Sequence, residues 1–217
     1  GAIAVTLFVA SVQKSNWFSV TAISLRSVGT FDFGQHNVSV SVNRSGDYVL
    51  NTWYRMNVPV LVLNQPYVAG GDPGIYVNAQ LSWTAKLMHN VFNRVNIAFN
   101  ELIVQEIDAA YFDFYYQFKL RGSKRIGYRN MIGDVASLTT PVGPGIALGD
   151  GSPRSVPLPF WFSEDSGIAL PVAAMPFNDI RINFYFRHLA ELVTIYPGTD
   201  AVGGPGGPNT GRTANVG

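Results

Sequence analysis

The chain has 217 residues, a formal net charge of +1 and no cysteine, and only 13% of its residues are charged. The lack of cysteine excludes disulfides and thiolate metal sites, and the small net charge provides no strong field that would attract nucleic acid. The apolar fraction of 47% argues against disorder, although a typical soluble domain carries charge on about 25% of its residues.

The first 16 residues are predicted to form a separate N-terminal segment. Residues 2–12 are apolar but lack the basic start and the small-residue cleavage pattern of a signal peptide, so a strand is the preferred interpretation. A second short strand is expected at residues 17–20. No apolar run reaches the length of about 18 residues that a membrane-spanning helix needs, and membrane insertion is therefore not expected.

The next part of the chain shows the period-two pattern of β-strands. Val38, Val40 and Val42 alternate with serines, which predicts a strand with one buried face. Four later segments also have strand character: residues 48–56, 91–99, 157–162 and 180–186. The prolines of the segment at 157–162 favour a position at a sheet edge or a strand end.

Residues 108–120 depart from the strand pattern. Asp108 is a candidate N-cap, and five apolar side chains around and after it fall at helical spacing, which predicts a short helix of about three turns in a long connection. These side chains are Ile107, Tyr111, Phe114, Tyr115 and Phe118. An aromatic-rich strand remains an alternative, because aromatic residues favour strands. Several short strands with regular turn signals and little helix indicate an all-β sandwich or barrel.

The last 20 residues, 198–217, contain seven glycines and two prolines, which predicts a linker or tail. Residues 206–213 nearly match a phosphate-binding loop, but Arg212 stands where that motif needs lysine. The glycine-rich linker is the better interpretation, so no nucleotide site is assigned.

The sequence contains no set of residues that specifies catalysis or metal binding. His36, His89 and His188 lie far apart, and none belongs to a recognised metal-ligand spacing. No nucleophile elbow of the form G-x-S-x-G occurs. Carboxylates such as Glu101, Glu106, Asp108 and the pair Glu164-Asp165 are expected to be surface groups. We therefore predict a protein that is not an enzyme and that has no catalytic, cofactor-binding or metal-binding residues.

The densest positive charge lies at residues 119–129, which hold five of the fifteen basic residues. These are Lys119, Arg121, Lys124, Arg125 and Arg129. The segment is short and the whole protein is nearly neutral, so direct nucleic-acid binding is not expected. A loop that pairs with acidic groups of a neighbouring subunit is the candidate interpretation, and a plain solvated loop is the alternative.

Several long phrases resemble the first jelly roll of the major capsid proteins of nucleocytoplasmic large DNA viruses, with iridovirus-like and marseillevirus-like members closest. They follow the family's order along residues 17–196, which makes a chance similarity improbable. The phrases are FGQHNVSVSVNRSGDYVL at 33–50, MHNVFNRVNIAFN at 88–100, AYFD at 110–113, KRIGYRNMIG at 124–133, LPFWFSEDSGIALP at 158–171 and PFNDIRI at 176–182.

The resemblance implies an antiparallel, eight-stranded jelly-roll sandwich over residues 17–197, with the one short helix in a long connection. Members of the family carry two jelly rolls in tandem, so the similarity covers the first of them and the second is expected to be absent from this chain. Within the matching phrases, Leu158, Phe160 and Phe162 are expected on one side of a strand, where they enter the core.

The resemblance also implies the function of a structural capsid protein, which forms trimeric, pseudo-hexagonal capsomers of an icosahedral shell. Its partners would be copies of itself, neighbouring capsomers, and minor capsid and penton proteins, in a virion assembled in the host cytoplasm. The low charge agrees with this role, because charged residues are depleted at the centres of protein interfaces. A carbohydrate-binding or glycan-processing jelly roll is the alternative, and it would need exposed aromatics and paired carboxylates in a groove.

Overall fold

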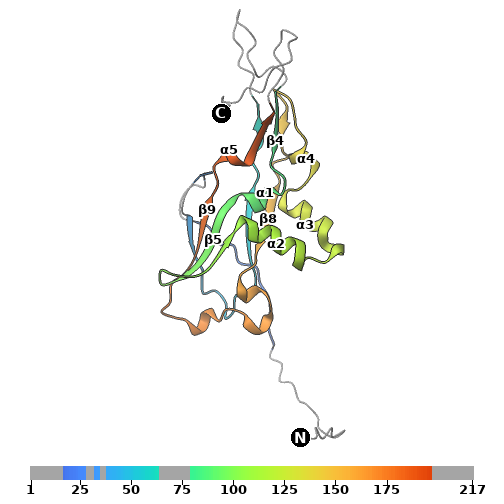
Figure 1. Cartoon of the computed structure of the whole chain (residues 1–217). Coiled ribbons are helices and arrows are strands. Elements are labelled where there is room, and N and C mark those ends of the chain that lie inside the picture. The colour runs from blue at the N-terminus through green and yellow to red at the C-terminus, as the bar shows by residue number, and fades with distance from the viewer. Residues whose placement is uncertain (1–16, 28–31, 35–37, 64–78, 197–217) are drawn as a thin grey trace, which may run out of the picture.

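The computed structural model describes residues 17–27, 32–34, 38–63 and 79–196. The predicted segment 2–12 and the predicted linker or tail at 198–217 lie outside these residues. The described part contains ten strands and five α-helices, and short 3-10 turns connect several of them (Figure 1). The strands are β1 Val38–Ser41, β2 Thr52–Asn57, β3 Leu61–Val62, β4 Gln80–Trp83, β5 Phe92–Phe99, β6 Leu102–Asp108, β7 Ala147–Leu148, β8 Pro153–Leu158, β9 Ile180–Phe186 and β10 Val193–Tyr196. The helices are α1 Leu87–Asn90, α2 Ala109–Lys119, α3 Arg125–Ile132, α4 Ala136–Thr139 and α5 Leu189–Leu192.

The largest sheet has four strands in the order β1-β9-β5-β6, and the remaining strands form the pairs β10-β4, β2-β8 and β3-β7. Every one of these pairings is antiparallel. The predicted strands at 38–42, 91–99 and 180–186 are thus confirmed as β1, β5 and β9. The strand predicted at 48–56 is shorter than expected, because Val49 makes only an isolated bridge to Leu170 and regular pairing starts at Thr52.

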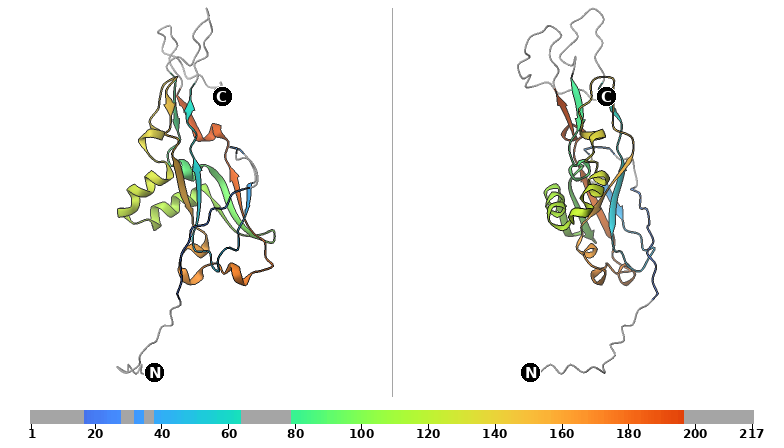
Figure 2. Two further views of the ribbon diagram at one scale, coloured as in Figure 1. Left: turned by 180° about the vertical axis from the view of Figure 1, so that it is seen from behind. Right: turned by 90° about the vertical axis from the view of Figure 1, so that its right-hand side faces the viewer.

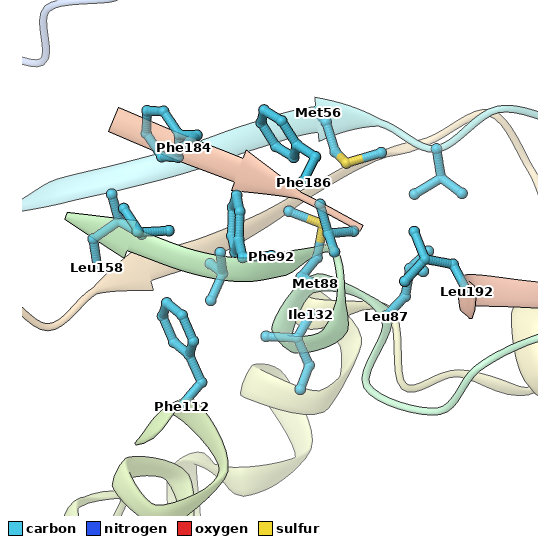
Figure 3. Close-up of a cluster of buried hydrophobic side chains, with 14 of the residues drawn as sticks. Met56, Leu87, Met88, Phe92, Phe112, Ile132, Leu158, Phe184, Phe186 and Leu192 are labelled. Carbon is cyan, nitrogen blue, oxygen red and sulfur yellow. The ribbon is translucent and has the colours of Figure 1, made fainter. Parts of the chain in front are cut away.

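The core lies between the four-stranded sheet and the β2-β8 pair, and it is rich in aromatic rings (Figure 3). The ring of Tyr54 on β2 packs edge-on against Phe92 of β5, with centroids 4.8 Å apart. It also lies 5.4 Å from Phe184 and 5.8 Å from Phe186 of β9. Alternate residues of β9 are buried, as the period-two pattern predicted, because only one face of this antiparallel sheet meets the core.

Two predicted strands are wrong. Residues 17–27 have no regular secondary structure, and the side chain of Trp17 is fully exposed, because no described strand pairs with this segment. The segment 157–162 is a strand only to Leu158. Pro159 has no N–H for a ladder, and the chain turns into the 3-10 segment Trp161–Ser163. The burial that was predicted for Leu158, Phe160 and Phe162 is nevertheless confirmed.

The prediction of a single short helix in an all-β fold is also wrong, since the described fold is β-rich but mixed. The helix expected at 108–120 is confirmed as α2, but α3 forms where a basic loop was expected. Gly127 in the middle of α3 weakens the helical signal. Tyr128 and Ile132 supply the buried side of this helix, and tertiary packing therefore decides its structure. The helices α2 and α3 project from one side of the sheets (Figure 1). No helix within the described ranges is both long and apolar enough to span a membrane.

Candidate interaction surface

Helix α2 begins as the sequence predicted but buries a different face. The carboxylate of Asp108 accepts a hydrogen bond from the backbone N–H of Tyr111 at 2.7 Å, which is the expected N-cap. The buried residues are Phe112 and Tyr116, whereas the stripe that contains Phe114 and Phe118 faces outward. The outward face of this helix is therefore aromatic and exposed.

A buried histidine attaches both projecting helices to α1. His89 Nδ1 lies 2.9 Å from Asp113 Oδ1 on α2, and His89 Nε2 lies 3.0 Å from the hydroxyl of Tyr128 on α3. Because a carboxylate only accepts, Nδ1 carries the proton, and Nε2 is left to accept from Tyr128. Lys86 Nζ also donates to Asp113 Oδ1 at 3.1 Å. We call these four residues the His89 network.

Burial sets the protonation states in this network. Burial lowers the pKa of His89, and the hydrogen bond with Asp113 opposes that shift only in part. Burial would raise the pKa of Asp113, but hydrogen bonds from His89 and Lys86 lower it overall. Burial also raises the pKa of Tyr128. At neutral pH, His89 is therefore a neutral imidazole between the carboxylate of Asp113 and the neutral phenol of Tyr128.

The five basic residues predicted to contact a partner are all exposed around the junction of α2 and α3. Two of them already have partners in the chain, since Lys119 pairs with Glu164 and Arg129 Nε lies 2.7 Å from Asp134 Oδ2. Arg125 donates a long hydrogen bond of 3.4 Å to the carbonyl of Gln117, which joins the end of α2 to the start of α3.

Arg121, Lys124 and Arg125 have no acidic partner among the described residues. Large exposed apolar side chains occur on the same two helices. Phe114 and Phe118 have ring centroids 4.6 Å apart and are both exposed, as is Ile126 on α3. We refer to the three cations and these three apolar residues as the helical corner. Exposed apolar groups beside unpaired charges are typical of a surface that binds another protein.

A shallow depression of about 410 Å³ lies on the outer face of the four-stranded sheet. It is lined by Asn93, Arg94, Glu106, Asp108, Tyr185 and Phe186. The guanidinium of Arg94 lies 4.2 Å from the ring centre of Tyr185 and 3.6 Å from Glu106, while Asp108 caps α2. The ring of Tyr185 and the carboxylate of Asp108, which a sugar site would need, are thus already engaged within the chain.

The histidines do not form a metal site in the part of the chain that the structure describes, where no group of three or more potential ligands occurs. His89 belongs to the network above. His188 precedes α5, and its carbonyl accepts from the N–H of Glu191, whose carboxylate lies 3.5 Å from Arg187. His36 lies outside the described residues. No sequence motif marks the His89 network, since Asp113 and Tyr128 lie 24 and 39 positions from His89 in the chain.

The comparisons with known proteins agree on one family. Residues 6–207 match the family described as "Major capsid protein N-terminus". The chain is 43% identical over 198 residues to the major capsid protein of Wiseana iridescent virus, covering 90% of this chain and 39% of that protein. It is 38% identical over 194 residues to the major capsid protein of Lymphocystis disease virus 1, covering 88% of this chain and 40% of the relative. The chain therefore spans about two fifths of the length of these relatives.

A solved structure supports the same fold. The structure described as PBCV-1 VP54 fitted into a reconstruction of the virophage Sputnik matches with a TM-score of 0.62, at 19% sequence identity. The match covers 88% of this chain and 43% of that one. The chain thus has the fold of the corresponding part of that protein.

Proposed function

Because the chain belongs to the major capsid protein family of large DNA viruses, we propose that it is part of a structural protein that assembles into the shell of a virion. The observation that carries this proposal is the family match over residues 6–207, together with identity of 43% to an iridescent virus capsid protein. The proposed role is structural: the protein acts through its shape and its association with other copies, without a catalytic step or a cofactor.

The assembly we propose has three copies in each pseudo-hexagonal capsomer, with two antiparallel eight-stranded jelly rolls in every full-length subunit. Residues 17–197 would belong to the first jelly roll, residues 1–16 would precede it, and residues 198–217 would lead away from it. The two-layer core between the four-stranded sheet and β2-β8 supports this proposal, since a jelly roll packs two antiparallel sheets face to face.

The outer face of the four-stranded sheet supports a role in close packing. A row of amides and hydroxyls crosses the middle of this face, between the charged depression at Arg94 and Glu106 and the exposed Arg181. Ser39 donates to Asn183, and Asn183 donates to Asn96 Oδ1 at 2.8 Å, so a polar row crosses three strands. Asn96 is buried, and its Nδ2 has no hydrogen-bond partner in the described chain. Removing such a neutral polar row from water against a neighbouring subunit costs less free energy than removing charged groups.

We propose that the basic segment lies at a contact between subunits. Arg121, Lys124 and Arg125 would meet the neighbour, and Lys119 and Arg129 would hold the corner in shape through Glu164 and Asp134. Minor capsid and penton proteins would be further partners in the virion, which would be assembled in the host cytoplasm without direct nucleic-acid contact or membrane insertion.

Electron microscopy of the purified full-length gene product tests the proposal. We expect particles that are trimers with a six-fold-like outline, because a subunit with two similar lobes forms a pseudo-hexagon when three copies close into a ring. Monomers with an open groove that bind glycans would contradict it.

A further inference from the structure

The strand β6 forms one edge of the four-stranded sheet and is unusually apolar for an exposed edge. Its first three residues, Leu102, Ile103 and Val104, are consecutive and all exposed, with Leu102 at 71%. Leu102 and Ile103 pair with successive residues of β5, so their side chains point to opposite faces, and Val104 is the extra residue of a bulge between Ile103 and Gln105. Edge strands of this kind pair with or bind other chains unless something covers them.

Carboxylates surround this apolar stretch. Glu101 lies in the turn before β6 with φ of +73°, is exposed, and has no cationic partner among the described residues. Glu106 follows at the other end, and its one ion-pair partner among the described residues is Arg94, at the long distance of 3.6 Å. We refer to Glu101, Leu102, Ile103, Val104 and Glu106 as the strand edge.

The strand edge and the helical corner are chemically complementary. Each places three exposed apolar side chains beside charges, and the charges are of opposite sign. The corner offers the cations Arg121, Lys124 and Arg125, and the edge offers the carboxylates Glu101 and Glu106. Complementary charge around an apolar contact selects the partner and the orientation of docking.

Residues 101–104 of the strand edge and the helical corner lie on opposite sides of the molecule, whereas Glu106 lies nearer the α2 end of β6. The hairpin that joins β5 to β6 projects to one side in Figure 1, and α2 and α3 project to the other. The view from behind in Figure 2 shows the same separation with left and right exchanged. The helical corner of one copy can therefore contact the strand edge of another copy more readily than the strand edge of its own chain. Such a head-to-tail contact uses two different patches, which is the kind of contact that closes rings.

We propose that the helical corner of one copy docks on the strand edge of a second copy. This inference rests on the proposed function, because it names the receiving surface for the cations assigned there. Phe114, Phe118 and Ile126 would cover Leu102, Ile103 and Val104, while the cations would pair with Glu101 and Glu106. Burying both apolar stretches removes them from water at the same time.

Charge reversal in the 217-residue chain tests the inference, with association measured by sedimentation velocity over a concentration series. The corner variant carries Arg121→Glu, Lys124→Glu and Arg125→Glu, and the edge variant carries Glu101→Lys and Glu106→Lys. We expect each variant to weaken association by about tenfold or more, because like charges then face one another. A chain with both sets of changes is again complementary to itself, and we expect its association to return to within about threefold of wild type.

The control changes exposed residues that belong to neither surface, as Arg26→Glu, Arg55→Glu, Asn51→Asp and Asn57→Asp, and matches the net-charge change of the corner variant. Its association should equal that of the wild type, and circular dichroism should show that all variants are folded. If the wild type associates but the edge variant neither weakens association nor rescues the corner variant, the inference is wrong and the proposed function stands. A wild-type chain that stays monomeric at every concentration overturns the inference, and electron microscopy of the full-length product then decides the proposed function separately.

Discussion

His89 Nδ1 lies 2.9 Å from Asp113 Oδ1, and this contact joins the core of the domain to the base of the helical corner. The imidazole is almost fully buried, whereas half of the Asp113 side chain is exposed. The ring also stacks at 5.7 Å on Phe112, the residue before Asp113. The His89 network and the ring of Phe112 thus attach the helical corner to the core.

Replacement of His89 by alanine should destabilise the domain by about 2–4 kcal/mol, because it creates a cavity and leaves the buried hydroxyl of Tyr128 without its acceptor. Chemical denaturation measures the change. Lys124→Ala on the exposed corner is the control and should alter the free energy of unfolding by less than about 0.5 kcal/mol. Equal effects of the two substitutions would show that the network contributes nothing to stability.

The same network predicts loss of stability in mild acid. The pKa of His89 is lowered by burial, and that of Asp113 is lowered overall by hydrogen bonds, so the unfolded chain binds more protons than the folded chain at both groups. The contribution of His89 is therefore complete above the ordinary histidine pKa of about 6.5 and is lost as the pH falls below it.

Urea unfolding at pH 7.5, 6.5 and 5.5 measures this dependence. We expect the free energy of unfolding of the wild type to fall across the series and that of His89→Gln to fall less. A parallel decline in the two proteins would mean that other groups cause the acid sensitivity.

The sequence predicted the elements that depend on local signals and missed those that depend on distant neighbours. Asp108 was identified as a cap because its N–H partner is only three residues away. The buried face of α2 was predicted wrongly, because aromatics occupy almost every position from Tyr111 to Phe118 and no spacing singles out Phe112 and Tyr116. The role of the five basic residues stays a prediction, and their division into paired and unpaired cations depends on the fold, which brings Glu164 to Lys119 across 45 positions and turns Asp134 toward Arg129 at the end of α3.

The aromatic core should respond strongly to loss of a ring at a site that sequence reasoning placed correctly. Phe160 is 0% exposed and stacks on Phe162 with centroids 5.7 Å apart. Phe160→Ala should destabilise the domain by about 3–5 kcal/mol through lost burial and an unfilled cavity. Phe177, which lies in the next family segment at 176–182 and is 95% exposed, is the matched control, and Phe177→Ala should change stability by less than about 0.5 kcal/mol. Thermal unfolding of both variants measures the difference, and similar midpoints would contradict the described packing.

Two glycines of the α3 region should respond to alanine in opposite directions. Gly133 ends α3 with φ of +81°, and its N–H bonds back to the carbonyls of Arg129 and Asn130. A Cβ at this position would meet Leu138 Cδ1 at 3.2 Å and would occupy a left-handed conformation that alanine disfavours. Gly127 lies within α3 and would meet nothing within 4 Å. There alanine reduces the freedom of the unfolded chain and favours the helix.

We therefore expect Gly133→Ala to lower the free energy of unfolding by about 1–2 kcal/mol and Gly127→Ala to raise it by about 0.5–1 kcal/mol. Chemical denaturation of the two variants beside the wild type measures both shifts. Gly127 is also the residue that weakens the helical signal of this segment. Stabilisation by Gly127→Ala would therefore show that tertiary packing, and not the helix preference of residue 127, holds α3 in place. Destabilisation by Gly127→Ala would instead show that the exposed side of α3 needs a glycine, and the segment would then not be an ordinary helix.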